Sequence, residues 1–118
     1  MDTQSNEGRV DYIEFPALDI AKIKAFYAGV FRWKFTDYGP DYTSFEDGRL
    51  TGGFWKQAKV APDGGPLVVI YAADLAGMEA KVRAAGGAIV KEIFPFPGGR
   101  RFHFTDPGGN QLAVWSEQ

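Results

Sequence analysis

The sequence contains two side chains whose type and setting suit proton transfer, Glu14 and His103. Glu14 lies near the end of an apolar stretch, and a carboxyl group inside an apolar cavity can serve as a general base. His103 is the single histidine and can act as a general base or as a metal ligand. Each has a structural alternative. Glu14 can pair with an arginine or a backbone amide, and His103, between Phe102 and Phe104, can simply pack within a strand.

Two adjacent arginines suggest a second chemistry, the binding of an anion. Arg100 and Arg101 follow a pair of glycines at positions 98 and 99, and guanidinium groups on a loop can clamp a carboxylate or a phosphate. The alternative is a solvated loop. The sequence has no cysteine, which removes thiolate nucleophiles and cysteine metal sites. It also has no nucleophile elbow, phosphate loop or dinucleotide motif.

The composition is that of one compact domain. The chain has 118 residues, of which 45% are hydrophobic and 15% aromatic, enough to bury a core. Its net charge is −2 and it has no basic stripe, so we expect neither a nucleic-acid partner nor a membrane partner. Residues 1–9 predict a flexible tail, and the polar N-terminus does not read as a signal peptide. The absence of cysteine fits a cytoplasmic location.

The elements that must position Glu14 begin with a strand over residues 10–15, which we expect to end at Pro16. Asp19 suits the N-cap of a helix over residues 20–31, because the apolar positions there follow a helical stripe. The rest of this half is predicted to form strands over residues 34–38, 42–46 and 50–55, followed by a linker over residues 56–66.

The same order of elements then repeats. The second half is predicted to form a strand (67–71), a helix (75–85), a strand (88–94), a loop (94–99) and two strands (101–105 and 110–115). Asp74 caps this helix as Asp19 caps the first, and Trp115 matches Trp55 near the end of each half. The predicted fold class is α+β: two βαβββ modules, about residues 10–56 and 67–116, form a cupped mixed sheet with the helices outside. Together they make one domain over residues 10–118.

Two motifs now carry a family resemblance. Residues 104–112 read FTDPGGNQL, and residues 14–19 read EFPALD, followed by Phe26-Tyr27 and by FRW at residues 31–33. At this separation, and with the internal repeat, the chain resembles the vicinal oxygen chelate superfamily of glyoxalases, bleomycin resistance proteins and extradiol dioxygenases. The resemblance implies paired modules around a cavity and frequent dimerisation, so we expect a homodimer.

The resemblance also implies where a metal would be bound. Metal-using members hold a divalent ion with one side chain on the first and one on the last strand of each half, normally His, Glu or Gln. Alignment on the motifs places these positions at Tyr12, at about Val68, at Gly53 (or Gly52 with a slip of one residue) and at Ala113. Val, Ala and Gly have no ligating side chain. We therefore predict no metal at the family's site and no cofactor.

Three hypotheses for function follow. The first is a metal-free binding protein that holds a small apolar or aromatic molecule in the cup. We expect the ligand to be bound by the side chains that strand alternation places there: Tyr12, Glu14, Trp55, Gln111 and Trp115. The second is a lyase or dioxygenase-type enzyme related to glyoxalase I, in which Glu14, His103 or Tyr12 acts at a non-standard site. The third is a structural or regulatory domain whose own side chains fill the cup. Whether the protein is an enzyme stays open at this point.

Overall fold

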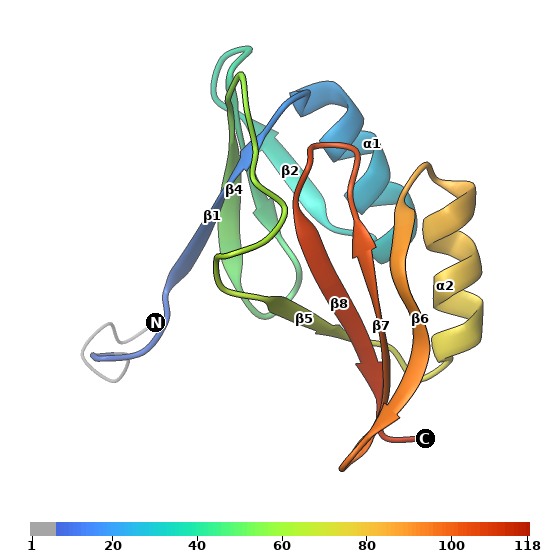
Figure 1. Cartoon of the computed structure of the whole chain (residues 1–118). Coiled ribbons are helices and arrows are strands. Elements are labelled where there is room, and N and C mark those ends of the chain that lie inside the picture. Colours follow the sequence, from blue (N-terminus) through green and yellow to red (C-terminus); the bar gives the residue numbers. More distant parts are fainter. Residues whose placement is uncertain (1–6) are drawn as a thin grey trace.

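The computed structural model describes residues 7–118, which form two successive modules of one helix and four strands each (Figure 1). The first module contains β1 (Tyr12–Ala17), α1 (Ile20–Phe31), β2 (Lys34–Asp37), β3 (Tyr42–Glu46) and β4 (Thr51–Lys56). The second contains β5 (Val68–Tyr71), α2 (Leu75–Ala84), β6 (Ala88–Phe96), β7 (Gly99–Thr105) and β8 (Gln111–Ser116).

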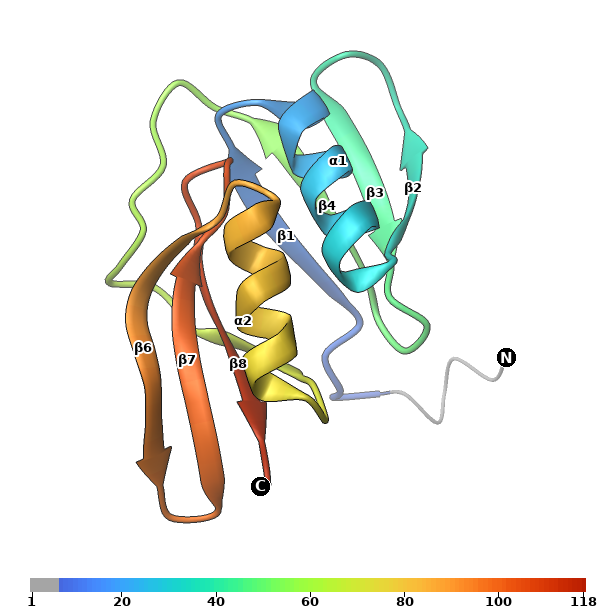
Figure 2. The ribbon, with the colours of Figure 1, turned by 90° about the vertical axis from the view of Figure 1, so that its right-hand side faces the viewer.

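Each module has its own mixed sheet of four strands. The order is β1-β4-β3-β2 in the first sheet and β5-β8-β7-β6 in the second. β1 runs parallel to β4 and β5 runs parallel to β8, while the remaining pairs are antiparallel. This arrangement confirms the predicted α+β class and the repeated βαβββ unit. Both helices lie on the same side of the sheets (Figure 2).

The helices begin where the predicted caps lie. The side chain of Asp19 accepts a hydrogen bond from the backbone N–H of Lys22 at 3.0 Å, and the side chain of Asp74 accepts one from Gly77 at 3.0 Å. These bonds satisfy backbone donors that have no partner in the first turn of a helix. α1 has the predicted bounds, and its apolar stripe is buried against the sheets.

Stacked aromatic rings form the core of the first module. The ring of Tyr27 on α1 lies 4.5 Å from that of Trp33, and Trp33 lies 4.4 Å from Phe45 on β3. Tyr27 also stacks on Phe54 of β4 at 5.4 Å. Such offset stacks add stabilisation to the burial of the rings. They attach α1 to one face of the first sheet and leave the other face without a helix.

The β7–β8 turn joins the two modules through the motif that the sequence singled out. The hydroxyl of Tyr27 donates to the carboxylate of Asp106 at 2.7 Å, and the side chain of Asn110 donates to the carbonyl of Pro16 at 2.6 Å. The backbone N–H of Leu18 donates to the carbonyl of Gly108 at 3.1 Å. The close of module two is thus bonded to the strand and helix that open module one.

Most predicted bounds differ from the observed ones by one or two residues, and two of these differences have a clear physical reason. β1 continues through Pro16 to Ala17, because β1 is an edge strand and proline is tolerated where one side needs no backbone donor. The predicted loop over residues 94–99 is a tight hairpin, since β6 runs to Phe96 and β7 begins at Gly99. Of the expected flexible tail, residues 1–6 lie outside the described part of the chain. Neither described helix has the length and apolar character of a membrane span.

Candidate functional site

Each sheet has one face packed against a helix and one face without a helix, which we call the open face. On the first sheet, strand alternation places on the open face a set of residues that includes Tyr12, Glu14, Tyr42, Ser44, Gly53 and Trp55, with Pro16, Glu46 and Thr51 toward the strand ends. On the second sheet the open face carries Val69, Tyr71, Arg101, His103, Gln111, Ala113 and Trp115. All five predicted ligand-binding residues therefore lie on open faces.

On the first open face, Tyr12, Tyr42 and Glu14 form a continuous chain of hydrogen bonds. The hydroxyl oxygens of Tyr12 and Tyr42 are 2.5 Å apart, and Tyr42 donates to the carboxylate of Glu14 at 2.9 Å. Loss of water contact raises the pKa of Tyr42, and its bonds to Tyr12 and Glu14 raise it further, so this phenol keeps its proton at neutral pH.

Gly53 leaves the space that this chain of hydrogen bonds needs. It lies in β4 between β1 and β3, opposite Glu14 on one side and Ser44 on the other. A Cβ atom at this position would collide with the hydroxyls of both Tyr42 and Tyr12. The two phenols therefore occupy the space above Gly53. Sequence reasoning missed Tyr42, although a glycine inside a strand is a signal of close approach.

On the second open face, His103 is packed into the surface of the sheet. Its Nδ1 atom lies 3.1 Å from the side-chain nitrogen of Gln111, and an amide nitrogen only donates, so Nδ1 accepts and carries no proton. The ring lies 5.7 Å from that of Phe94, and the residue is only 4% exposed. Burial lowers the pKa of His103, with smaller contributions from Arg101 and Lys91. These contacts fit the packing alternative better than a role in proton transfer.

The two arginines form neither the anion clamp nor the solvated loop that the sequence left as alternatives. Both lie in β7, where successive side chains point to opposite faces. The guanidinium of Arg101 lies over the rings of Phe94 and Phe96, at 5.4 and 5.5 Å from their centroids. Arg100 instead donates through Nε to the backbone carbonyl of Gln118 at 2.7 Å. The clamp hypothesis assumed a loop, and the extended β6–β7 hairpin separates the two charges.

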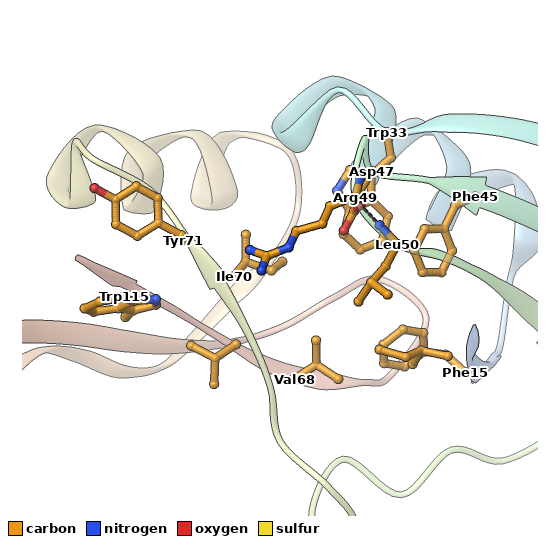
Figure 3. A pocket seen from close by; sticks show the side chains of 12 residues that line it. Phe15, Trp33, Phe45, Asp47, Arg49, Leu50, Val68, Ile70, Tyr71 and Trp115 are labelled. Carbon is orange, nitrogen blue, oxygen red and sulfur yellow. Dashed lines mark hydrogen bonds between the residues drawn. The ribbon is translucent and has the colours of Figure 1, made fainter. Parts of the chain in front are cut away.

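A cavity of about 520 Å³ separates the first sheet from the edge strand β5. Its walls are mostly apolar and aromatic, and Figure 3 shows Trp115 and Tyr71 on the side of β5 and β8, with Phe15 and Trp33 on the other side. The carboxylate of Asp47 accepts bonds from the backbone N–H groups of the turn before β4, and the side chain of Arg49 extends from this turn toward Ile70 (Figure 3).

A second cavity of about 220 Å³ lies beside β1. Glu14 and Gln111 both line it, together with prolines of β1 and of the segment between the modules. Of the predicted ligand-binding residues, Trp115 thus lines the larger cavity, and Glu14 and Gln111 share the smaller one. Tyr12 adjoins Glu14 through Tyr42. Trp55 lies on the open face and lines neither of these two cavities.

The residues at the family's ligand positions do not fit a divalent ion. Tyr12 is engaged with Tyr42, Gly53 lies beneath both phenols, and Ala113 has no donor atom. The position expected at about Val68 is occupied by its neighbour Val69, because Val68 packs against the core and Val69 is the open-face partner of Ala113. Val69 is equally unable to ligate. Residues 7–118 contain no group of three His, Cys, Asp or Glu side chains that could hold a metal.

Paired βαβββ modules with an open sheet face define a glyoxalase-like class of protein, and comparison with known families agrees. The model of the Glyoxalase/Bleomycin resistance protein/Dioxygenase superfamily matches residues 9–114. The chain belongs to this superfamily. No curated protein matches it significantly in sequence.

Solved structures show the same fold at low identity. One is a family enzyme from Burkholderia phytofirmans PsJN, 17% identical, with a TM-score of 0.79 over 92% of this chain and 100% of that one. Another is a mutant of the fosfomycin resistance protein FosX from Listeria monocytogenes, solved with Mn(II), 16% identical, with a TM-score of 0.80 over 92% and 90%. TioX from Micromonospora sp. ML1 is 18% identical, with a TM-score of 0.71 over 94% and 100%.

Proposed function

We propose that this protein binds a small, partly aromatic or apolar molecule and does so without a metal ion. The observation that carries the proposal is the cavity of about 520 Å³ between the first sheet and β5. Its volume lies within the range of small-molecule sites, which are concave and mostly apolar with a few polar groups. Here the polar groups are the charged ends of Asp47 and Arg49 at one margin.

The chemistry of the ligand positions supports binding over metal-assisted catalysis. FosX from Listeria monocytogenes was solved with Mn(II), but its likeness to this chain concerns the fold, and function depends on the residues of the site. Tyr12, Gly53, Val69 and Ala113 together offer one oxygen atom at most, already bonded to Tyr42. His103 and Glu14, the candidates for catalysis, lie on different sheets.

A neutral aromatic probe tests this proposal. N-phenyl-1-naphthylamine should bind saturably to the native protein, and Trp115→Ala should weaken that binding about tenfold, because an aromatic wall of the cavity is lost. The measurement is probe fluorescence during titration. Val90→Ala is the matched control, since Val90 is an exposed apolar residue of β6 outside the cavity lining.

Two results would contradict the proposal. One is binding that Val90→Ala weakens as much as Trp115→Ala does. The other is a stoichiometric amount of nickel, zinc, iron or manganese in the purified protein, together with loss of probe binding after chelation. That second result would favour the enzyme hypothesis, because it would show that the site depends on an ion that the side chains at the family's positions are not expected to hold.

We also propose that the protein is a cytoplasmic homodimer. β1 and β5 are each the last strand of their sheet on one side, and exposed apolar side chains, among them Val69 and Tyr71, lie on β5. Such an edge is a template for pairing with a second chain. Light scattering should give twice the chain mass of 13.0 kDa. Val69→Asp should shift the protein toward the monomer, whereas Val90→Asp should not. A monomeric wild-type protein at high concentration would contradict the proposal.

A further inference from the structure

Counting protons shows which group donates and which accepts in the hydrogen-bond chain of Tyr12, Tyr42 and Glu14. Tyr42 has one hydroxyl proton and donates it to Glu14. The bond between the two phenols therefore takes its proton from Tyr12. Both phenol protons are used inside the cluster. The cluster therefore offers a ligand only hydrogen-bond acceptors, the oxygen of Tyr12 and the carboxylate of Glu14.

Two further aromatic residues lie next to Tyr42 on the same face as these acceptors. Tyr38 follows β2 and lies 6.5 Å from Tyr42, centroid to centroid, and Trp55 lies directly across from Tyr42 in the β3–β4 register. The rings of Tyr12, Tyr38 and Trp55 remain exposed, at 43%, 66% and 42%. We call Tyr12, Tyr38, Tyr42 and Trp55 the aromatic belt. It crosses the open face of the first sheet from β1 to the end of β2.

The negative charge of Glu14, beside the aromatic belt, has no basic partner within residues 7–118. The ion pairs there join Lys24 to Asp37 and Arg83 to Glu79, and neither involves Glu14. An unpaired carboxylate beside exposed aromatic faces attracts cations in two ways, by charge and by the negative faces of the rings. The same arrangement repels anions, because it offers them no free donor.

We propose that Glu14 and the aromatic belt bind the cationic end of an organic ligand, an alkylammonium or a guanidinium group. This inference rests on the proposed function and extends it from the larger cavity to the smaller one beside it, because Ile13, Phe15 and Val68 line both. Glu14 also lines the cavity of about 220 Å³ beside β1, whose other walls include Pro16, Pro62 and Pro66. The cationic group would lie at Glu14, and the apolar remainder of the ligand would lie against these prolines.

Three probes that share a phenyl ring and differ in charge test the proposal. They are benzylamine, benzyl alcohol and benzoate, which are cationic, neutral and anionic at pH 7. Binding is followed by saturation-transfer NMR titration of the native protein. We expect benzylamine to bind about fivefold more tightly than benzyl alcohol, and benzoate to bind most weakly. Glu14→Gln should remove the advantage of benzylamine and leave benzyl alcohol unchanged.

Glu46→Gln is the matched control, because Glu46 is an exposed carboxylate at the far end of β3 and its loss changes the net charge equally. Equal binding of benzylamine and benzyl alcohol to the wild type would overturn this inference and leave the proposed function standing. An equal effect of Glu46→Gln and Glu14→Gln would overturn it too, since net charge alone would then explain the preference. Failure of the proposed function is recognised separately, by the absence of binding of N-phenyl-1-naphthylamine and of benzyl alcohol.

Discussion

Replacing Asp106 with alanine is expected to lower the free energy of unfolding by about 4 kcal/mol. One carboxylate oxygen of Asp106 accepts from the hydroxyl of Tyr27 at 2.7 Å, and the other accepts from the backbone N–H groups of Gly108 and Asn110 at 2.8 and 3.0 Å. Alanine would leave three donors unsatisfied at the contact between the modules, where Asp106 is only 4% exposed. Urea unfolding followed by tryptophan fluorescence measures the change.

Asp106→Asn is the matched control and should cost only about 1 kcal/mol at pH 7. The amide oxygen can still accept from Gly108 and Asn110, and the amide nitrogen can donate to Tyr27 if that hydroxyl turns its proton away. A loss as large as that of the alanine variant would contradict this account. An alanine variant within about 1 kcal/mol of the wild type would show that the turn does not depend on these bonds.

The pH dependence of the asparagine variant follows from the pKa of Asp106. Burial raises this pKa above its ordinary value, although the hydrogen bonds from Tyr27, Asn110 and Gly108 oppose the shift. Folding therefore favours the protonated carboxyl group. Its contribution to stability is largest below the unfolded pKa and falls as the pH rises through the folded pKa. The stability deficit of Asp106→Asn should thus be larger at pH 4 than at pH 7.

The fold was predictable because its signals are local. Asp19 and Asp74 cap helices through bonds to residues three positions ahead, and such bonds depend on residue type and spacing alone. The turn that contains Asp106 is equally local, since two of its three bonds reach Gly108 and Asn110. What these signals did not reveal is that the same carboxylate also bonds Tyr27, which is distant in sequence.

The site was predictable only in part, because it depends on contacts between strands. Strand alternation placed Tyr12 and Glu14 on one face, as the structure has them. Tyr42 joins them from β3, and that contact requires the register of β3 against β4 and the absence of a side chain at Gly53. The position given as about Val68 could not be fixed to a single residue for a related reason, since a short apolar strand has no polar alternation to show which side is buried; the structure pairs Val69 with Ala113.

Two neighbouring glycines of β4, Gly52 and Gly53, are expected to respond differently to alanine. The first substitution should affect stability, and the second should affect ligand preference. Gly52→Ala is expected to lower the free energy of unfolding by about 3 kcal/mol. Inserting extra atoms into a well-packed core commonly costs about 1–3 kcal/mol of stability. A Cβ at this position would collide with the backbone carbonyl of Ile13 and with the buried ring of Phe45. Gly52 lies opposite both residues, in a strand paired on either side, so neither the backbone nor the ring can give way easily.

Gly53→Ala should leave stability within about 1 kcal/mol of the wild type, because its Cβ would meet the hydroxyl ends of Tyr42 and Tyr12 on an exposed face, where both side chains can swing outward. The same change should break the bond between the phenols and reduce the preference for benzylamine as Glu14→Gln does. Urea unfolding and probe titration of both variants measure the two effects. Equal destabilisation by both substitutions would contradict this division, since it would mean that the open face is packed as tightly as the core.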